Sequence, residues 1–128
     1  MTQPDETHGA FSWNELITND PEAAKKFYQA LFGWSLVEFP MENDSYHVVK
    51  VEGEEKGGIM KTPPEAEGMP PSWGIYVTVS NVDETAARAE ELGGKVLVPP
   101  RDIPNVGRFC VLQDPQGAYL SAITYVKM

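Results

Sequence analysis

Cysteine is nearly absent from this chain, in which Cys110 is the single cysteine among 128 residues. One thiol excludes an intramolecular disulfide framework and any zinc site built from several thiolates. We therefore expect a reducing, cytoplasmic environment. Apolar residues flank Cys110 and no base lies nearby in the sequence, so an inert buried thiol is favoured over a nucleophile.

Long apolar runs and an excess of basic residues are also missing. No segment approaches the roughly 20 apolar residues of a membrane-spanning helix, and the N-terminal MTQPDETHGA lacks the basic and apolar regions of a signal peptide. The 19 acidic and 10 basic residues give a net charge of -9, the wrong sign for binding nucleic acid phosphates. We expect neither a membrane nor a nucleic acid partner.

Several common catalytic and nucleotide-binding motifs are lacking as well. The chain contains no HExxH, GxSxG, GxGxxG or GxxxxGK[ST] sequence, so hydrolase, zincin and phosphate-loop functions have no support. We assign Gly57-Gly58 and Gly93-Gly94 to turns and helix ends. The pair Glu54-Glu55 is interpreted as a solvated hairpin turn, with no chemistry.

The hydrophobic pattern predicts two successive βαβββ units. In the first, a strand from Phe11 precedes a helix that Asp20 caps, with Pro21 at its first position, and Gly33 ends it. Its apolar stripe is expected to pack on a sheet. The other predicted strands are 34–39, 46–52 and 58–61 in the first unit, and 73–79, 95–98, 108–112 and 119–125 in the second, whose helix is capped by Asn81.

These elements give the expected organisation of the chain. Residues 1–10 are polar and predict a flexible arm, and the proline-rich segment 61–72 predicts a linker. Modules 11–60 and 73–126 are each too small to bury much surface alone, so they should form one domain over 11–126. Displacements of both 60 and 61 residues align the halves, which leaves the repeat register open by one residue.

Three segments resemble the vicinal oxygen chelate (VOC) superfamily, which includes glyoxalase I, the bleomycin resistance proteins and extradiol dioxygenases. They are FYQALFGW, PPSWGIYVTVSNVDETAARAEELGGKV and VGRFCVLQDPQGAYL. The resemblance implies an α+β fold, in which paired βαβββ modules form curved mixed sheets around a cavity. It also implies a homodimer, because small members usually pair and thereby cover strand edges.

Catalytic members of this superfamily bind a divalent metal at four positions, one on each of four strands. The resemblance places these positions on Trp13, Met60, Gly74 and Ser121. None of these residues offers the imidazole or carboxylate that such an ion needs. We therefore expect the usual metal site to be lost, assign no metal ligand or cofactor, and interpret the four positions as ligand-binding.

Glu15 is the best candidate for a catalytic or ligand-binding residue. It lies two residues after Trp13 on the same strand face, which the resemblance points into the cavity. A partly buried carboxylate there could accept a proton or bind a cationic or hydroxylated ligand. The alternative is a structural carboxylate that is hydrogen-bonded to a neighbouring strand.

The other candidates are one histidine and several aromatic residues. His47 is the one histidine within the predicted fold, and it is either a bonded structural residue or a ligand-binding group. Trp13, Trp73, Tyr76 and Phe109 would line either an aromatic cavity or an ordinary core.

Two main functions follow from these residues. The first is a glyoxalase-like domain that binds a small organic molecule in an aromatic cavity, without the family metal. The alternative is an enzyme of the lyase, isomerase or dioxygenase type, with Glu15 as base or with a rearranged metal site that includes Glu15 and His47. An interaction domain with a filled cavity is a third alternative.

Overall fold

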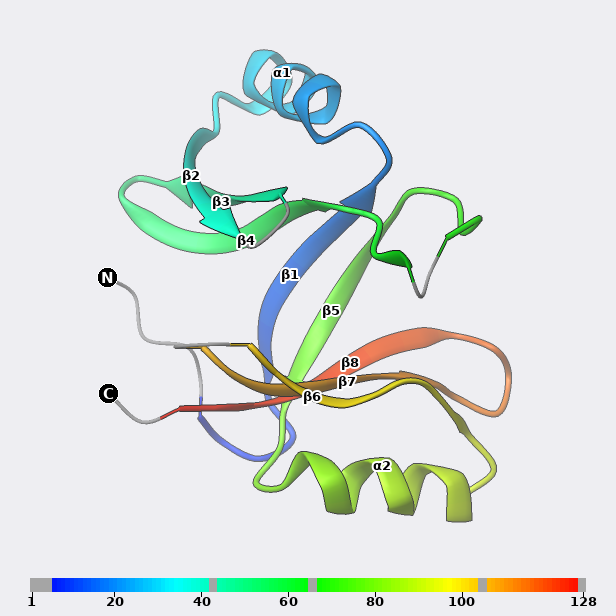
Figure 1. Cartoon of the computed structure of the whole chain (residues 1–128). Coiled ribbons are helices and arrows are strands. Elements are labelled where there is room, and N and C mark those ends of the chain that lie inside the picture. Colours follow the sequence, from blue (N-terminus) through cyan, green and yellow to red (C-terminus); the bar gives the residue numbers. More distant parts are fainter. Residues whose placement is uncertain (1–5, 42–43, 65–66, 104–105, 127–128) are drawn as a thin grey trace. The chain divides into compact units, whose positions relative to one another are not determined.

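The computed structural model describes residues 6–41, 44–64, 67–103 and 106–126. It separates into two compact units (Figure 1). Within the described residues, unit 1 contains 14–74 and unit 2 contains 6–13 and 75–126. No helix among these residues is long and apolar enough to cross a membrane.

Unit 1 contains most of β1 (Phe11–Thr18) and the elements α1 (Pro21–Phe32), β2 (Ser35–Met41), β3 (Asp44–Val51) and β4 (Glu54–Lys61). Its strands follow the order β2-β3-β4-β1. The β1–β4 pair is parallel, whereas β2–β3 and β3–β4 are antiparallel. Helix α1 packs against β2 and β4 of this sheet.

Unit 2 repeats this arrangement with most of β5 (Ser72–Thr78) and with α2 (Val82–Glu91), β6 (Lys95–Ile103), β7 (Gly107–Gln113) and β8 (Tyr119–Tyr125). The strand order is β5-β8-β7-β6, and β5 and β8 form its parallel pair. Helix α2 packs against β6, β7 and β8 (Figure 1). The predicted α+β fold with two βαβββ units is therefore confirmed.

Both helices begin and end where their capping residues predict. The Asp20 side chain accepts a hydrogen bond from the Ala23 amide at 3.1 Å, and Asn81 accepts one from the Glu84 amide at 3.0 Å. Gly33 ends α1 in the left-handed conformation, with φ of 73°.

The β3–β4 hairpin differs from its predicted form. Its turn is Glu52-Gly53, where both residues have positive φ values, and β4 begins at once with Glu54. A two-residue turn of this kind needs positive φ at both positions, so Glu54 and Glu55 enter the strand. Gly57, which was expected in the turn, and Gly58, which was expected at the junction of the turn and the strand 58–61, are both buried within β4.

Two strands continue beyond their predicted ends. β2 includes Pro40, and β6 includes Pro99 and Pro100, although proline cannot donate a hydrogen bond to a neighbouring strand. Both strands lie at the end of their unit's strand order, where one side is not paired within that unit. Proline is tolerated at such edges.

Each unit has its own apolar core between helix and sheet. In unit 1, Leu16, Val49 and Ile59 form the core, and Ala24 and Tyr28 of α1 pack on it. In unit 2 the core comprises Val79, Val82, Ala86, Cys110, Leu112 and Ala122. The predicted α1 stripe is only partly buried, because Phe27 and Leu31 remain 58% and 57% exposed.

Strand pairing determines how the two units correspond. Glu15 of β1 lies opposite Gly58 of β4, as Tyr76 of β5 lies opposite Ser121 of β8. Equivalent positions on the first strand of each unit therefore differ by 61 in residue number, as the helix caps Asp20 and Asn81 do. The difference is 63 residues on the last two strands of each unit, where Val48 pairs with Gly58 and Val111 with Ser121.

The segment before β1 is tied to unit 2 by hydrogen bonds. The Gly9 amide donates to the Thr78 carbonyl at 2.7 Å, and the Thr78 amide donates to the Ala10 carbonyl at 2.9 Å. His8 accepts a hydrogen bond from the Ser80 amide through Nδ1. The flexibility predicted for residues 1–10 stays a prediction.

Candidate functional site

The sheet of unit 1 has two faces with different uses. Alternation along the strands places Leu16, Val49 and Ile59 on one face, which packs against α1 and is called the helix face here. The opposite face, called the Glu15 face, carries Glu15 of β1 and Gly58 of β4, which lie side by side.

Glu15 forms a close hydrogen bond on this face. It is 6% exposed, and its Oε2 accepts a hydrogen bond of 2.7 Å from the Tyr46 hydroxyl of β3. The Tyr46 ring lies over Gly58, where any Cβ atom would overlap the ring. Gly58 therefore gives Tyr46 the room to reach Glu15 across β4.

Tyr46 and Gly58 were not among the residues predicted for the site. A glycine inside a strand often marks a place where another group approaches closely, and this was the available signal. It was obscured because Gly57-Gly58 was interpreted as a turn.

Two other predicted residues, Met60 and Gly74, lie in unit 1, and Trp13, which belongs to unit 2, lies on the same strand as Glu15. Met60 follows Gly58 by two positions in β4, and Trp13 precedes Glu15 by two in β1, so strand alternation places each on the same side as its neighbour. Both are half-buried. A Cβ atom on Gly74 would lie 3.9 Å from the Glu15 carbonyl oxygen, an ordinary contact.

His47 lies on the helix face instead. It follows Tyr46 directly in β3, so the two side chains point to opposite sides of the sheet. One ring nitrogen of His47 and one carboxylate oxygen from each of Glu22 and Glu38 lie within 4.8 Å of one another. The structure therefore does not bring Glu15 and His47 together, and the hypothesis of a metal site shared by these two residues is wrong.

Trp73 also lies apart from Glu15. Its Nε1 donates a hydrogen bond of 3.0 Å to the Tyr28 hydroxyl, and its ring makes edge contacts with Tyr28 and Trp34. Tyr28 and Trp34 pack against the core on the helix face. Trp73 thus belongs to an aromatic cluster around α1.

The remaining predicted residues lie in unit 2. Tyr76 is buried, and its ring centroid is 6.4 Å from that of Phe109. Ser121 is half-buried opposite Tyr76. Cys110 is fully buried, and this burial raises the pKa of its thiol above the ordinary value. A protonated, inaccessible thiol agrees with the predicted inert role.

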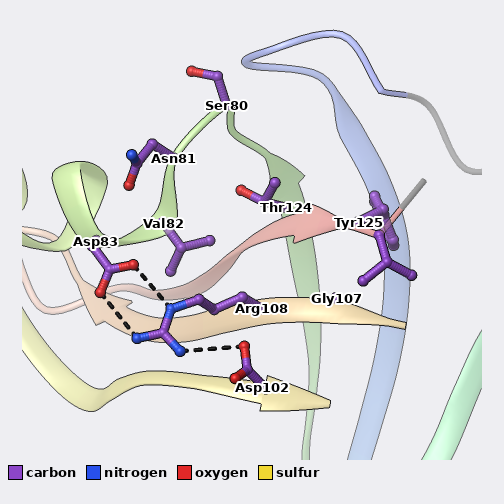
Figure 2. A pocket seen from close by; sticks show the side chains of 10 residues that line it. Ser80, Asn81, Val82, Asp83, Asp102, Gly107, Arg108, Thr124 and Tyr125 are labelled. Carbon is purple, nitrogen blue, oxygen red and sulfur yellow. Dashed lines mark hydrogen bonds and ion pairs between the residues drawn. The ribbon is translucent and has the colours of Figure 1, made fainter. Parts of the chain in front are cut away.

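A surface depression of about 310 Å³ lies in unit 2 beside the start of α2 (Figure 2). Arg108 points into it and donates two hydrogen bonds to the Asp83 carboxylate, at 2.9 and 3.0 Å. A third, of 3.2 Å, goes to Asp102. The hydrogen bond from Arg108 lowers the pKa of Asp83. The Arg108 guanidinium of this depression is thus already engaged by two carboxylates.

A family model of the Glyoxalase/Bleomycin resistance protein/Dioxygenase superfamily matches residues 10–121. This chain belongs to that superfamily. The matched range includes Glu15, Tyr46 and Gly58, so the candidate site lies inside the family domain.

Two curated relatives are longer proteins. "Putative glyoxylase CFP32" of Mycobacterium tuberculosis is 44% identical over 118 residues, which cover 90% of this chain and 44% of that protein. "Anthracycline biosynthesis protein DnrV" of Streptomyces peucetius is 31% identical and is matched over 86% of this chain and 45% of its own length. The chain therefore spans less than half the length of these relatives.

A solved structure with the same fold is the methylmalonyl-CoA epimerase of Mycobacterium tuberculosis. It matches with a TM-score of 0.65 and 16% identity, over 99% of this chain and 94% of the epimerase. At this identity the likeness establishes the fold alone.

Proposed function

We propose that this chain binds a small organic molecule on the Glu15 face of unit 1, with Glu15 and Tyr46 as its polar contacts. The observation that carries the proposal is the 2.7 Å hydrogen bond from the Tyr46 hydroxyl to a Glu15 carboxylate that is only 6% exposed. A buried carboxylate is costly unless it is partnered. Tyr46 provides a partner and fixes the orientation of the group.

The chemistry of this pair indicates the class of ligand. A carboxylate accepts hydrogen bonds at about four lone-pair positions, so Glu15 can accept one from a ligand in addition to those from protein groups. Ligands with hydroxyl groups or a cationic amine match a carboxylate acceptor. The names of the relatives, a glyoxylase and an anthracycline biosynthesis protein, support a small organic ligand.

The same proposal includes loss of the family's metal site. Its four positions carry an indole in Trp13, a thioether in Met60, no side chain in Gly74 and a hydroxyl in Ser121. This donor set does not fit a catalytic divalent ion, which prefers imidazole and carboxylate ligands. We therefore derive no catalytic step through a metal at these positions.

An enzyme is the second candidate function. The buried, oriented carboxylate of Glu15 favours it, because a general base must be held within hydrogen-bond reach of the proton that it removes. In this case Glu15 would accept a proton from a ligand on the Glu15 face, without a metal. Turnover of a bound compound, lost in Glu15→Gln, would distinguish the enzyme from a binding module.

The proposal is tested by calorimetric titration with three compounds of the stated chemistry: daunorubicin, bleomycin and catechol. We expect at least one to bind, and we expect Glu15→Gln to weaken that binding about tenfold or more, because charge-assisted hydrogen bonds contribute about 1.5–3 kcal/mol. Tyr46→Phe should weaken it less. Glu90→Gln, on the exposed surface of α2, removes the same charge and should leave the affinity unchanged.

Two outcomes would contradict the proposal. One is the absence of binding by all three compounds at millimolar concentration. The other is a Glu15→Gln variant that loses thermal stability while its ligand affinity stays intact, which would make Glu15 a structural strand residue.

A homodimer in the cytoplasm is part of the same proposal. Phe27, Leu31 and Phe32 of α1 are each more than half exposed, and a second copy of the chain would cover such an apolar surface. Light scattering at micromolar concentration should give twice the mass of one chain. A monomer under these conditions would contradict this part of the proposal.

A further inference from the structure

A cluster of three metal-ligating side chains lies on the helix face of unit 1, away from the Glu15 face. Glu38 of β2 and His47 of β3 are directly opposite each other in the antiparallel pair, which places their side chains on the same face. Glu22 comes from the first turn of α1. One ligand atom from each residue lies within 4.8 Å of the other two.

His47 is the member of this cluster that needs an explanation. Its side chain is 3% exposed, and its Nδ1 is buried without any hydrogen-bond partner. Buried polar atoms are nearly always paired, because an unpaired one costs about 1–3 kcal/mol. One nitrogen of this imidazole lies within 4.8 Å of a carboxylate oxygen of Glu22 and of Glu38. A buried imidazole with one unpartnered nitrogen, placed beside two acidic groups, has the donor set of a metal-binding site.

The charges around the cluster are only partly compensated. Lys25 contacts Glu22 at 3.2 Å, but this is a partly exposed pair between neighbouring turns of one helix, which contributes little. Glu22 also suits the positive end of α1, and this structural role explains Glu22 alone. Within the described residues, Glu38 has no ion-pair partner.

In the corresponding part of unit 2, an arginine bridges two carboxylates. The displacements of 61 and 63 residues make Asp83 the counterpart of Glu22, and Cys110 the counterpart of His47. In unit 2 the Arg108 guanidinium forms ion pairs with both Asp83 and Asp102. Cys110 is fully buried and forms part of the apolar core. Unit 1 thus has two carboxylates and an imidazole where unit 2 has an arginine bridge and an apolar thiol.

We propose that Glu22, Glu38 and His47 bind a divalent transition-metal ion of the Zn²⁺ type. One imidazole nitrogen and two carboxylate oxygens are ordinary ligands for such an ion. Ligand atoms at about 2.1 Å from an ion are at most about 4.2 Å apart, so the two exposed glutamates need only small rotations to close on it. This site is separate from the Glu15 face and does not depend on the function proposed there.

The test is calorimetric titration of tag-free protein with Zn²⁺, with the melting temperature measured in parallel. We expect one ion per chain and a higher Tm with Zn²⁺, because an ion that binds only the folded state stabilises it. Mg²⁺ should bind much more weakly, because it prefers oxygen ligands alone.

Variants locate the ion. Glu38→Gln changes an exposed side chain and should leave the fold intact while weakening Zn²⁺ binding about tenfold or more, since even outer-shell partners of metal sites contribute 10–100-fold. His47→Gln should have a similar or larger effect. His8→Gln removes the other histidine, and Glu90→Gln removes one surface charge; both should bind as the unchanged chain does. Lys25→Gln should tighten binding, because it removes the cation that competes for Glu22.

The results that would overturn the proposal are equally specific. Less than one Zn²⁺ per chain, an unchanged affinity in Glu38→Gln, or loss of binding in His8→Gln would each exclude this site. If His47→Gln does not fold, Glu38→Gln and Lys25→Gln still test the site, because they should change the affinity for Zn²⁺ in opposite directions.

Discussion

The two βαβββ units share one topology but use equivalent positions for different purposes. In unit 1 the central parallel pair places the Glu15 carboxylate beside Gly58, and Tyr46 reaches over the glycine. The corresponding residues of unit 2 are Tyr76, Ser121 and Phe109, which supply aromatic rings and a hydroxyl. The repeated backbone therefore carries a buried carboxylate at this place in one unit and two aromatic rings in the other.

The packing of the helix against the sheet also differs between the two units. Unit 2 buries Val82 and Ala86 of α2 in an apolar core, whereas no residue of α1 is fully buried. Buried polar residues of unit 1 include Glu15 and His47. Polar groups in a protein interior lower stability unless they are partnered, so we expect unit 1 to be the unit that is specialised for binding.

The largest expected effect comes from filling the space at Gly58. Gly58→Ala should lower the free energy of unfolding by about 1–3 kcal/mol, because the new methyl group overlaps the Tyr46 ring inside a packed region. Gly74→Ala is the control, since its Cβ makes only an ordinary contact. Chemical denaturation measures both.

A double variant sharpens this prediction. In the Tyr46→Ala background the ring is gone, so adding Gly58→Ala should cost little. If Gly58→Ala is equally destabilising with and without the ring, then the close approach of Tyr46 is not what requires glycine there.

The next effect concerns the arginine bridge of unit 2. The pKa of Asp83 is lowered from its ordinary value of 3.8 by the hydrogen bond from Arg108. A lowered folded-state pKa means that the stabilisation is present above about pH 4 and is lost as the pH falls through the folded-state value. Arg108→Met should therefore reduce the Tm at pH 7 more than at pH 3. An equal reduction of the Tm at both pH values would show that the ion pair of Asp83 and Arg108 is not the source of this stabilisation.

Cys110 should react slowly in the folded protein. Burial raises the pKa of its thiol, so the reactive thiolate is scarce, and the side chain is inaccessible. A chromogenic disulfide reagent at pH 8 should modify it at least about tenfold more slowly than after unfolding in guanidinium. Equal rates would place the thiol at the surface.

The smallest effect on stability is expected for the partly exposed ion pair of α1. Lys25→Gln removes the ion pair with Glu22 and should change the free energy of unfolding by less than about 0.5 kcal/mol. A change above 1 kcal/mol would show that Lys25 stabilises the acidic cluster beyond an ordinary surface pair.

Much of the fold could be predicted from the sequence because its signals are local. Asp20, Pro21 and Gly33 define α1 through capping and φ preferences, and Asn81 caps α2. The alternating pattern located every strand, although the ends of β2, β4 and β6 were misplaced. Those ends depend on edge positions and on the two-residue turn at Glu52-Gly53, which strand periodicity does not encode.

The candidate site was only partly predictable. Glu15 could be identified because it shares a strand face with Trp13. The partner Tyr46 comes from a non-adjacent strand, and its approach depends on pairing registers that no local pattern contains. The group of Glu22, Glu38 and His47 likewise combines a helix start with two strands, so the sequence did not reveal it.

The most direct test of the account is to map the bound ligand onto the two units by NMR. Amide signals of ¹⁵N-labelled protein would be followed during titration with the compound that binds best among daunorubicin, bleomycin and catechol. We predict shifts of the amide signals of Glu15, Tyr46 and Gly58, with those of Asp83 and Arg108 unchanged. Shifts confined to Ser80, Asp83 and Arg108 would place the ligand in the depression of unit 2 and would contradict the account.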